Sequence, residues 1–432
     1  MSLGNNPSIV TNGLIFYYDM NNPSSYRSPP LRNVLTEILP RGQGSSSTYQ
    51  FSNGTENVYI PNLGFIPNCA YMDMYNDYNG GSNNCCPSPF SYGQGLSVSG
   101  STEYTYAIVY KSVNGYTNAN YMYHYEYNGG SYITEYGLFY SNGTYSGQVR
   151  HLGDDWYWAS SKFTTNASCN LFYTGAWMYE YARYNRLYVA KAMIVQGDYT
   201  NLHPKFWPAL NTTVSNTQAI VDLTNQHTIY PTNLTTTSYT ANRNSIRLNS
   251  SSTNQYIYTD GTNYWNAWSP DGSVGNSNLT LEIIFKTNSE TDDGFIISRP
   301  WNGSGQYNYY VTAGSFQLYI GSNSASMGFD GVYDGNIQHM VYWMNSTQFG
   351  VYKNGKVYVS GTAHNLTGGG ASAGNNQFGT LVGSLYPYGE GWGGNSGFSV
   401  SADVYLFRIY NRALSASEVE QNFVTQRGIY GI

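Results

Sequence analysis

Residues 401–423 show the clearest pattern of hydrophobic and polar positions in the chain. Val404 and Leu406 belong to an aromatic and β-branched run that predicts a β-strand. Ser415 is followed three residues later by Glu418, which is the spacing of a capping box at the start of a helix. The segment therefore predicts a final strand that leads directly into one short helix.

The rest of the second half alternates short strand-favouring runs with Gly and Asn turns, as antiparallel sheets do. Asn354 and Gly355 lie between two such runs and predict a two-residue type I′ hairpin, because both residues tolerate a positive φ. The predicted strands cover residues 279–286, 316–320, 339–344, 349–353, 356–359 and 404–410.

Three of these segments resemble, in order, the strands of laminin-G-like (concanavalin A-like) jelly rolls. This lectin-type β-sandwich family is common in secreted glycan binders and in bacteriophage virion proteins. The similar segments are LTLEIIFKT for an early strand, VYWMNSTQFGVYKNGKVY for the central hairpin and ADVYLFRIYNRALS for the closing strand. The resemblance implies a protein of recognition and not of chemistry.

The opening strand of that family is missing from the second half. A segment that resembles it, NGLIFYYDMNNPSSY, lies far away at residues 12–26. The resemblance therefore implies a discontinuous laminin-G-like domain made of residues 1–33 and 212–432. Its expected signature is pairing of strand 14–19 with a strand of the C-terminal half, in one sandwich with the closing strand.

Residues 34–211 then form an inserted unit. The segments GLSVSGSTEYTYAIVYK and RLYVAKAMIVQGDYTNLHPKFWP resemble the early and final strands of carbohydrate-binding-module jelly rolls. The fold expected is all-β: two antiparallel β-sandwich jelly rolls, one inserted in the other, with one short C-terminal helix. The alternative is two consecutive sandwiches, in which strand 14–19 pairs only with residues before 210.

Composition supports a neutral, polar and aromatic surface. The 46 tyrosines exceed the 19 basic and 25 acidic residues together, and helix-favouring residues are scarce. The net charge of -6 is spread along the chain without a Lys or Arg cluster, which argues against a nucleic-acid partner. No apolar run approaches the roughly 20 residues of a membrane span, and the N-terminus lacks a signal-peptide pattern. A virion protein released by lysis fits these features.

The four cysteines, Cys69, Cys85, Cys86 and Cys169, leave two readings open. Buried thiols are one, and one or two disulfides are the other, although a bond between the adjacent Cys85 and Cys86 would be strained. The sequence contains no Cys-x-x-Cys pair, so it gives no indication of a zinc site.

Motifs for catalysis are not found. The sequence has no Glu-x-Asp-x-x-Glu strand to place two carboxylates as retaining glycosidases do, no Gly-x-Ser-x-Gly and no His-Glu-x-x-His. The six histidines are dispersed. We therefore expect no enzyme activity.

Glycan binding needs flat aromatic faces and hydrogen-bonding side chains, and both are abundant. Trp156 and Trp158 alternate on one predicted strand, so both point to one face; they form either a sugar platform or part of the core. Tyr388, Glu390 and Trp392 lie in a Gly-rich loop and suit either a sugar or a subunit interface.

The laminin-G-like family in some members holds Ca²⁺ at the sandwich rim. Asp330 and Asp334 are the candidates for such a structural calcium, without a defined spacing to single them out. No other cofactor is expected.

The sequence thus predicts a non-enzymatic bacteriophage virion surface protein: a capsid decoration, a head fibre or a tail adhesin. Its expected partners are other virion proteins, further copies of itself and host-surface glycans. One alternative is a purely structural virion subunit whose aromatic residues form protein interfaces. The other is a glycan hydrolase or lyase.

Overall fold

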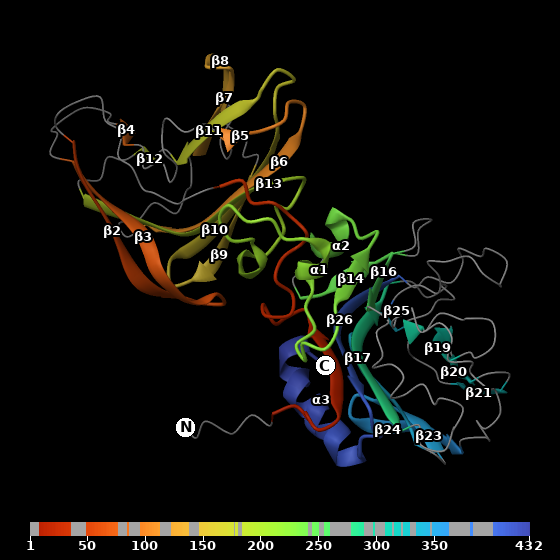
Figure 1. Ribbon diagram of the computed structural model, residues 1–432. Helices are drawn as coiled ribbons and strands as arrows, with labels where there is room; N and C mark the ends of the chain where they lie inside the picture. Colours follow the sequence, from red (N-terminus) through yellow and green to blue (C-terminus); the bar gives the residue numbers. More distant parts are fainter. Residues whose placement is uncertain are drawn as a thin grey trace, which may run out of the picture. The chain divides into compact units, whose positions relative to one another are not determined.

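The computed structural model has two compact units (Figure 1). One, the outer unit, consists of Met1–Arg27 and Asn216–Ile432; the other, the inserted unit, is Ser28–Ser215. Every strand pair among the described residues is antiparallel. The structure describes residues 8–35, 49–76, 84–85, 96–112, 122–137, 147–176, 178–179, 184–240, 244–249, 255–259, 278–288, 297–298, 307–312, 315–320, 323–328, 334–345, 348–362, 381–382 and 401–432.

The outer unit is built on a seven-stranded sheet that contains the first and the last strand among the described residues. Its order is β1-β26-β17-β22-β23-β24, and β15 also pairs with β26. The strands are β1 (Leu14–Asp19), β26 (Ala402–Tyr410), β17 (Leu279–Thr287), β22 (Gln338–Met344), β23 (Gln348–Lys353), β24 (Lys356–Thr362) and β15 (Ile246–Leu248). Tyr17 lies opposite Arg408 in the ladder, so the predicted pairing of strand 14–19 with a strand of the C-terminal half is confirmed, and that strand is the closing strand β26.

Two smaller sheets and short helices complete this unit. A four-stranded sheet contains β14 (Ile229–Thr232), β16 (Tyr256–Thr259), β25 (Leu381–Val382) and β18 (Ile297–Ser298). A three-stranded sheet contains β19 (Tyr307–Thr312), β20 (Ser315–Ile320) and β21 (Asn323–Gly328). The prediction of a single helix missed α1 (Asn216–Ala219) and α2 (Thr236–Thr240), single turns too short to leave a helical period in the sequence.

The predicted Asn354-Gly355 hairpin is confirmed. Asn354 has φ 50° and Gly355 φ 77°, and Lys353 pairs with Lys356 across the two-residue turn. Gly355 also lies against α3 (Ala416–Tyr430): a Cβ at this position would stand 2.7 Å from Cδ1 of Phe423. The turn therefore requires glycine both for its backbone and for its contact with the helix.

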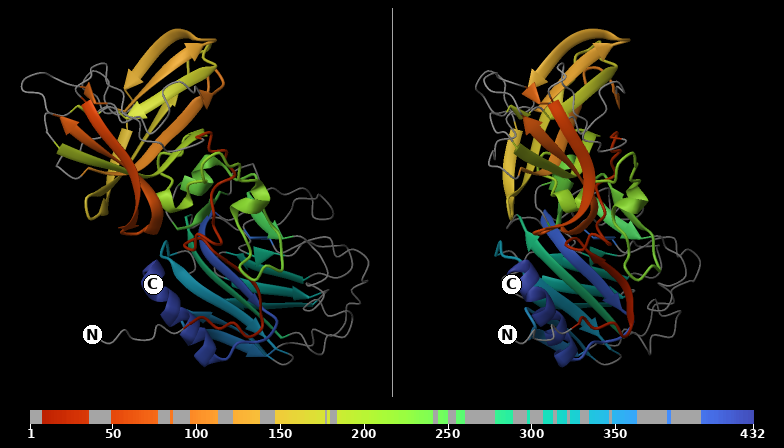
Figure 2. Two further views of the ribbon diagram at one scale, coloured as in Figure 1. Left: turned by 60° about the vertical axis from the view of Figure 1, so that its left-hand side comes forward. Right: turned by 90° about the vertical axis from the view of Figure 1, so that its left-hand side faces the viewer.

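The helix α3 begins where the sequence predicted. Ser415 is the N-cap, and its side chain and that of Glu418 form the full capping box. Figures 1 and 2 show α3 lying along one face of the seven-stranded sheet. Its buried residues recur with helical spacing, at Val419, Asn422, Gln426 and Tyr430.

A buried polar network lies between this sheet face and α3, with Glu282 at its centre. Oε1 of Glu282 accepts from Arg408 Nη1 at 2.9 Å and from His339 Nε2 at 2.8 Å. Oε2 accepts from Asn422 Nδ2 at 2.8 Å and from the Tyr410 hydroxyl at 3.2 Å. Both carboxylate oxygens are thus fully used, which buried charge requires.

The network extends to the N-terminal segment. Arg408 donates to the Tyr17 hydroxyl (3.2 Å), which in turn donates to Asp19 (3.1 Å). The Tyr430 hydroxyl of α3 donates to the other oxygen of Asp19 at 2.5 Å. Asn422 accepts from the backbone N–H of Val10 at 2.8 Å. Side-chain hydrogen bonds therefore attach the start of the chain to its last strand and last helix.

The inserted unit has a six-stranded sheet in the order β2-β3-β13-β6-β10-β9. Its strands are β2 (Tyr49–Ile60), β3 (Gly64–Asn76), β13 (Tyr184–Gln196), β6 (Glu103–Ser112), β10 (Trp156–Thr164) and β9 (Gly147–Gly153). A four-stranded sheet holds β5 (Leu96–Ser97), β11 (Leu171–Ala176), β7 (Met122–Asn128) and β8 (Ser131–Gly137), and β12 (Met178–Tyr179) pairs with β4 (Asn84–Cys85). A single 3₁₀ turn, η1 (Pro204–Phe206), follows β13.

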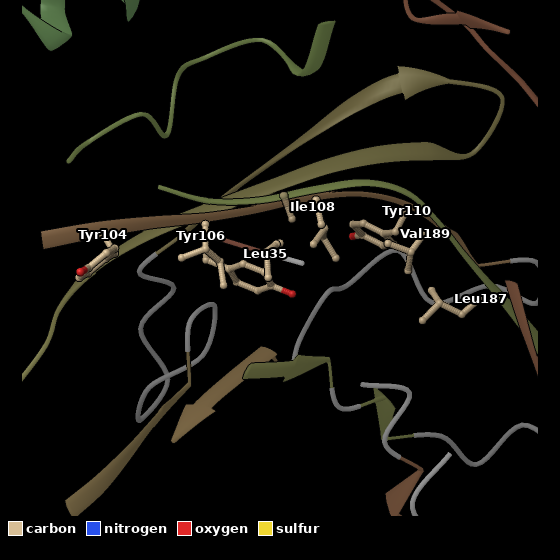
Figure 3. Packing of buried hydrophobic residues seen from close by; sticks show 10 residues of the cluster. Leu35, Tyr104, Tyr106, Ile108, Tyr110, Leu187 and Val189 are labelled. Carbon is tan, nitrogen blue, oxygen red and sulfur yellow. The ribbon is translucent and has the colours of Figure 1, made fainter. Parts of the chain in front are cut away.

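Tyrosine side chains form much of the hydrophobic core of the inserted unit. Figure 3 shows Tyr104, Tyr106 and Tyr110 of β6 on the same side of the sheet as Leu187 and Val189 of β13. The three tyrosines are at most 5% exposed. Alternation along β6 places them on one face, as expected for a strand of period two.

In the part of the chain that the structure describes, no helix is both long and apolar enough to cross a membrane.

Replacing Gly355 by alanine is expected to destabilise the protein more than replacing Gly335. Both glycines have positive φ, at 77° and 71°, so each substitution carries the left-handed penalty of about 1–2 kcal/mol. Only at Gly355 would the new methyl group meet the Phe423 ring. Denaturant unfolding of the two variants measures the difference; equal midpoints would contradict the contact with α3.

Glu282→Gln is expected to lower the free energy of unfolding by about 3–5 kcal/mol, because Arg408 would remain buried without its counter-charge. Glu418→Gln is the matched control: its partner Arg412 is partly exposed, and glutamine preserves the capping box. That variant is expected to lose less than about 1 kcal/mol. A similar loss in both would show that burial of the Glu282 pair is unimportant.

The same pair predicts an acid-sensitive step. Burial alone would raise the pKa of Glu282, but the charge of Arg408 and the hydrogen bond from His339 lower it to about 2. In the unfolded chain a glutamate titrates near about 4.3. Its contribution is therefore complete above that pH and is lost as the pH falls toward 2. Stability measured across this window should fall less steeply in Glu282→Gln than in the unmodified protein.

Candidate functional site

The predicted tryptophan platform is not exposed. Trp156 and Trp158 lie on one face of β10, as alternation predicted, but they are only 3% and 1% exposed. Trp156 packs against Tyr188 of β13, with ring centroids 5.9 Å apart. The core reading of these two residues is correct and the platform reading is wrong, because further chain covers this face of the sheet.

The cover over Trp158 comes from the segment that follows β13. The rings of His203 and Trp207 meet it edge-on at 5.6 and 6.3 Å, and Trp207 is fixed by a 2.8 Å hydrogen bond to the carbonyl of Leu202. The Arg150 guanidinium on the neighbouring strand β9 also lies 4.4 Å from the Trp158 ring centroid. These neighbours leave Trp158 almost completely buried.

The other predicted site residues form no site among the described residues. Tyr388, Glu390, Trp392 and Asp330 lie outside the described ranges. Asp334 is exposed and accepts hydrogen bonds from the Asn336 backbone and the Gln338 amide, so its carboxylate serves a turn. No group of three His, Cys, Asp or Glu side chains suited to a metal occurs in the described ranges.

Cys69 and Cys169 are buried free cysteines. Burial, with a contribution from Glu56, raises the pKa of Cys69 to about 12, and burial also raises the pKa of Cys169. Both thiols are therefore protonated at neutral pH. This agrees with the reading of buried thiols for Cys69 and Cys169 and gives them no nucleophilic character.

An exposed aromatic pair does occur, on the hairpin formed by β2 and β3. Tyr59 is 69% exposed and Phe65 is 63% exposed, and the two residues lie directly opposite each other in the ladder. Directly opposite residues point to the same face with Cβ atoms about 5 Å apart. Ile60, the neighbour of Tyr59, points to the opposite face and is completely buried. The hairpin is therefore anchored on one face and aromatic on the other.

The turn that joins the two strands follows from the sequence. Pro61 occupies the first central position of the turn, where the proline ring fixes φ. Asn62 adopts a positive φ of 66°, and Gly64 has φ 81°. The tip is held in place, because the Asn62 amide donates to the carbonyl of Leu152 and Pro61 fills the space beside Gly153 on β9. Tyr59 and Phe65 thus lie on a hairpin whose end is fixed.

The stem of the hairpin is also fixed. The Tyr188 hydroxyl donates to Glu56 Oε1 at 2.6 Å, and Arg186 pairs with the other oxygen of Glu56 at 3.4 Å. The Arg186 guanidinium lies 4.2 Å from the Tyr71 ring centroid. Gly54 faces Tyr71 across the ladder, and a Cβ there would collide with the ring. These contacts tie β2 and β3 to β13.

Amide side chains flank the aromatic pair on the same hairpin. Asn57 and Asn68 are both exposed, and the Asn57 side-chain oxygen accepts the backbone N–H of Asn68 at 3.1 Å. This bond leaves the Asn57 NH₂ group and the Asn68 amide at the surface. We call Tyr59, Phe65, Asn57 and Asn68 the hairpin surface. It combines flat apolar rings with hydrogen-bond donors and acceptors.

Sequence reasoning missed the hairpin surface because nothing local distinguishes these aromatic residues from the many others. The usable signal was the Pro61-Asn62 turn with an aromatic residue on each side, which predicts a hairpin tip. Which face of that hairpin is covered depends on the rest of the inserted unit and not on the turn; Figure 2 shows β2 and β3 as a long pair of strands in that unit.

Trp158→Ala is expected to destabilise the inserted unit by about 3–5 kcal/mol, as truncation of a large core aromatic does. Tyr59→Ser should change the free energy of unfolding by less than about 0.5 kcal/mol, because most of that side chain is already in water. Urea unfolding distinguishes the two. A stable Trp158→Ala variant would restore the platform reading.

Comparisons with known proteins give no family for this chain. No family model and no curated protein matches the sequence. Similar solved structures include the binding domain of Paraclostridial Mosquitocidal Protein 1 (19% identity, TM-score 0.35, 47% of this chain and 49% of that chain). The botulinum neurotoxin serotype D binding domain (16%, 0.33, 48% and 49%) and a Trypanosoma rangeli sialidase (13%, 0.33, 48% and 31%) are also similar. The chain spans less than half of each; similarity this low establishes neither a shared fold nor an activity.

Proposed function

We propose that this chain is a non-enzymatic surface protein of a bacteriophage particle that binds host-surface saccharides through the hairpin surface of its inserted unit. The virion assignment rests on the resemblance of residues 12–26 and 402–415 to laminin-G-like phage proteins. The binding assignment rests on one observation: Tyr59 and Phe65 are largely exposed, side by side, on a hairpin that is fixed at tip and stem.

Contiguous exposed apolar surface often marks an interaction site, and the adjacent rings of Tyr59 and Phe65 form such a surface. A sugar ring presents C–H groups on one face and hydroxyls at its edge, so it suits two adjacent rings bordered by Asn57 and Asn68. Because the hairpin is held before the ligand arrives, little conformational entropy is lost on binding. Many copies on one particle would turn weak single contacts into firm attachment.

The double variant Tyr59→Ser/Phe65→Ser is expected to bind bacterial surface polysaccharides at least about tenfold more weakly, equivalent to about 1.4 kcal/mol. Binding is measured on an array of such polysaccharides with the full chain. Tyr132→Ser is the matched control, because Tyr132 is 54% exposed on the β7–β8 hairpin of the same unit. It should bind normally.

Three other results would overturn the proposal. Undiminished binding by the double variant would remove the hairpin surface as the site. Normal polysaccharide binding with failed self-association or particle assembly would favour the structural alternative, in which these rings form a protein interface. Release of sugar from the polysaccharides would favour a hydrolase or lyase.

A further inference from the structure

The inserted unit contains an open cavity that shares no residue with the hairpin surface. Its volume is about 660 Å³, within the range of small-molecule sites. Three segments supply most of its lining: residues 30–32 and 34 before β2, residues 97–99 from the end of β5 onward, and residues 196, 197 and 199 at the end of β13. Tyr104 of β6 completes it. All belong to the inserted unit.

Each of these segments is fixed by hydrogen bonds. Asn33, completely buried, donates to the carbonyls of Ala192 and Pro208 (3.2 Å each) and accepts the Ile194 N–H at 3.0 Å. The second segment is held where the Ser99 N–H donates to the Tyr104 hydroxyl at 3.0 Å.

Thr105 fixes the third segment. Its hydroxyl donates to the Gly197 carbonyl at 2.6 Å and accepts the Tyr199 N–H at 2.8 Å. The cavity is therefore held open by the fold of the unit itself and needs no ligand to form it.

The lining carries one positive charge and no negative charge. Arg32 is exposed, and among the described residues its guanidinium has no hydrogen-bond or ion-pair partner. Glu103 and Asp198 are next to lining residues in the sequence, but neither belongs to the lining. Both pair with Lys162, at 3.4 and 2.9 Å. Nothing in the lining therefore neutralises Arg32.

The remaining polar groups suit hydroxyls. Ser97, Ser99 and Gln196 are exposed in the lining and supply two hydroxyls and an amide. Leu31 and Val98 supply apolar surface between them. A planar guanidinium binds a carboxylate through two parallel hydrogen bonds, which favours a carboxylate over a neutral group.

We propose that this cavity binds a small carboxylate-bearing saccharide, of the uronic acid class, with the carboxylate on Arg32 and the hydroxyls on Ser97, Ser99 and Gln196. The site is independent of the hairpin surface. An acidic saccharide bound here would be recognised by charge, whereas the hairpin surface recognises the ring faces of a sugar.

The test uses glucuronate and glucose as probes, titrated into the full chain by calorimetry. Glucuronate is expected to bind at least about tenfold more tightly than glucose, equivalent to about 1.4 kcal/mol, and to weaken as salt is added. Arg32→Gln should abolish the preference. Arg27→Gln removes an exposed arginine of the outer unit and makes the same change in net charge. This variant should keep the preference for glucuronate over glucose.

Equal binding of the two probes, no binding of glucuronate, or an unchanged preference in Arg32→Gln would overturn this proposal. The Tyr59→Ser/Phe65→Ser variant distinguishes it from the proposed function: it should retain glucuronate binding while losing polysaccharide binding. If Arg32→Gln loses glucuronate and the double variant still binds polysaccharide, the cavity stands and the hairpin surface fails.

Discussion

The buried carboxylate of Glu282 joins the two parts of the outer unit, Met1–Arg27 and Asn216–Ile432. Its carboxylate accepts hydrogen bonds from strand β26, strand β22 and helix α3, and Arg408 carries the network on to strand β1. A buried carboxylate is tolerable only if its charge is balanced and its oxygens are used. The same groups that stabilise Glu282 therefore hold the first strand, the last strand and the last helix together, although about 200 residues separate the two parts of the unit.

An unusual allocation of aromatic side chains distinguishes the inserted unit. Tyr104, Tyr106 and Tyr110 fill the core, and Trp156 and Trp158 are covered on the opposite face of the sheet. Aromatic side chains bury a large area each, so a unit rich in Gly, Ser and Asn can still form a core. Few large aromatic residues remain exposed among those described, and this gives the Tyr59–Phe65 pair its weight as a recognition site.

Both proposed sites lie on segments that the fold of the inserted unit fixes in advance. The hairpin surface is held by Glu56 and Asn62, and the cavity by Asn33 and Thr105. In each case hydrogen bonds from side chains to the backbone or to one another supplement the strand ladders. The two ends of the inserted unit lie side by side, because Arg32 pairs with Thr213 in an isolated bridge, and adjacent ends suit insertion into a loop of another domain.

Most strands of the seven-stranded sheet and the helix α3 were predictable, because alternation, Gly and Asn turns and the Ser415–Glu418 box are local signals that short-range geometry imposes. The Asn354-Gly355 hairpin and the helix α3 follow from them directly. The pairing of β1 with the C-terminal half was predictable only through family resemblance, since no local rule joins residues 400 positions apart. Which aromatic residues are exposed was beyond the sequence: Trp158 is covered by Trp207, whereas Tyr59 is largely exposed. Composition determined that this protein would be an aromatic, all-β chain, but burial depends on which distant segment packs over a face, and only the tertiary structure decides that.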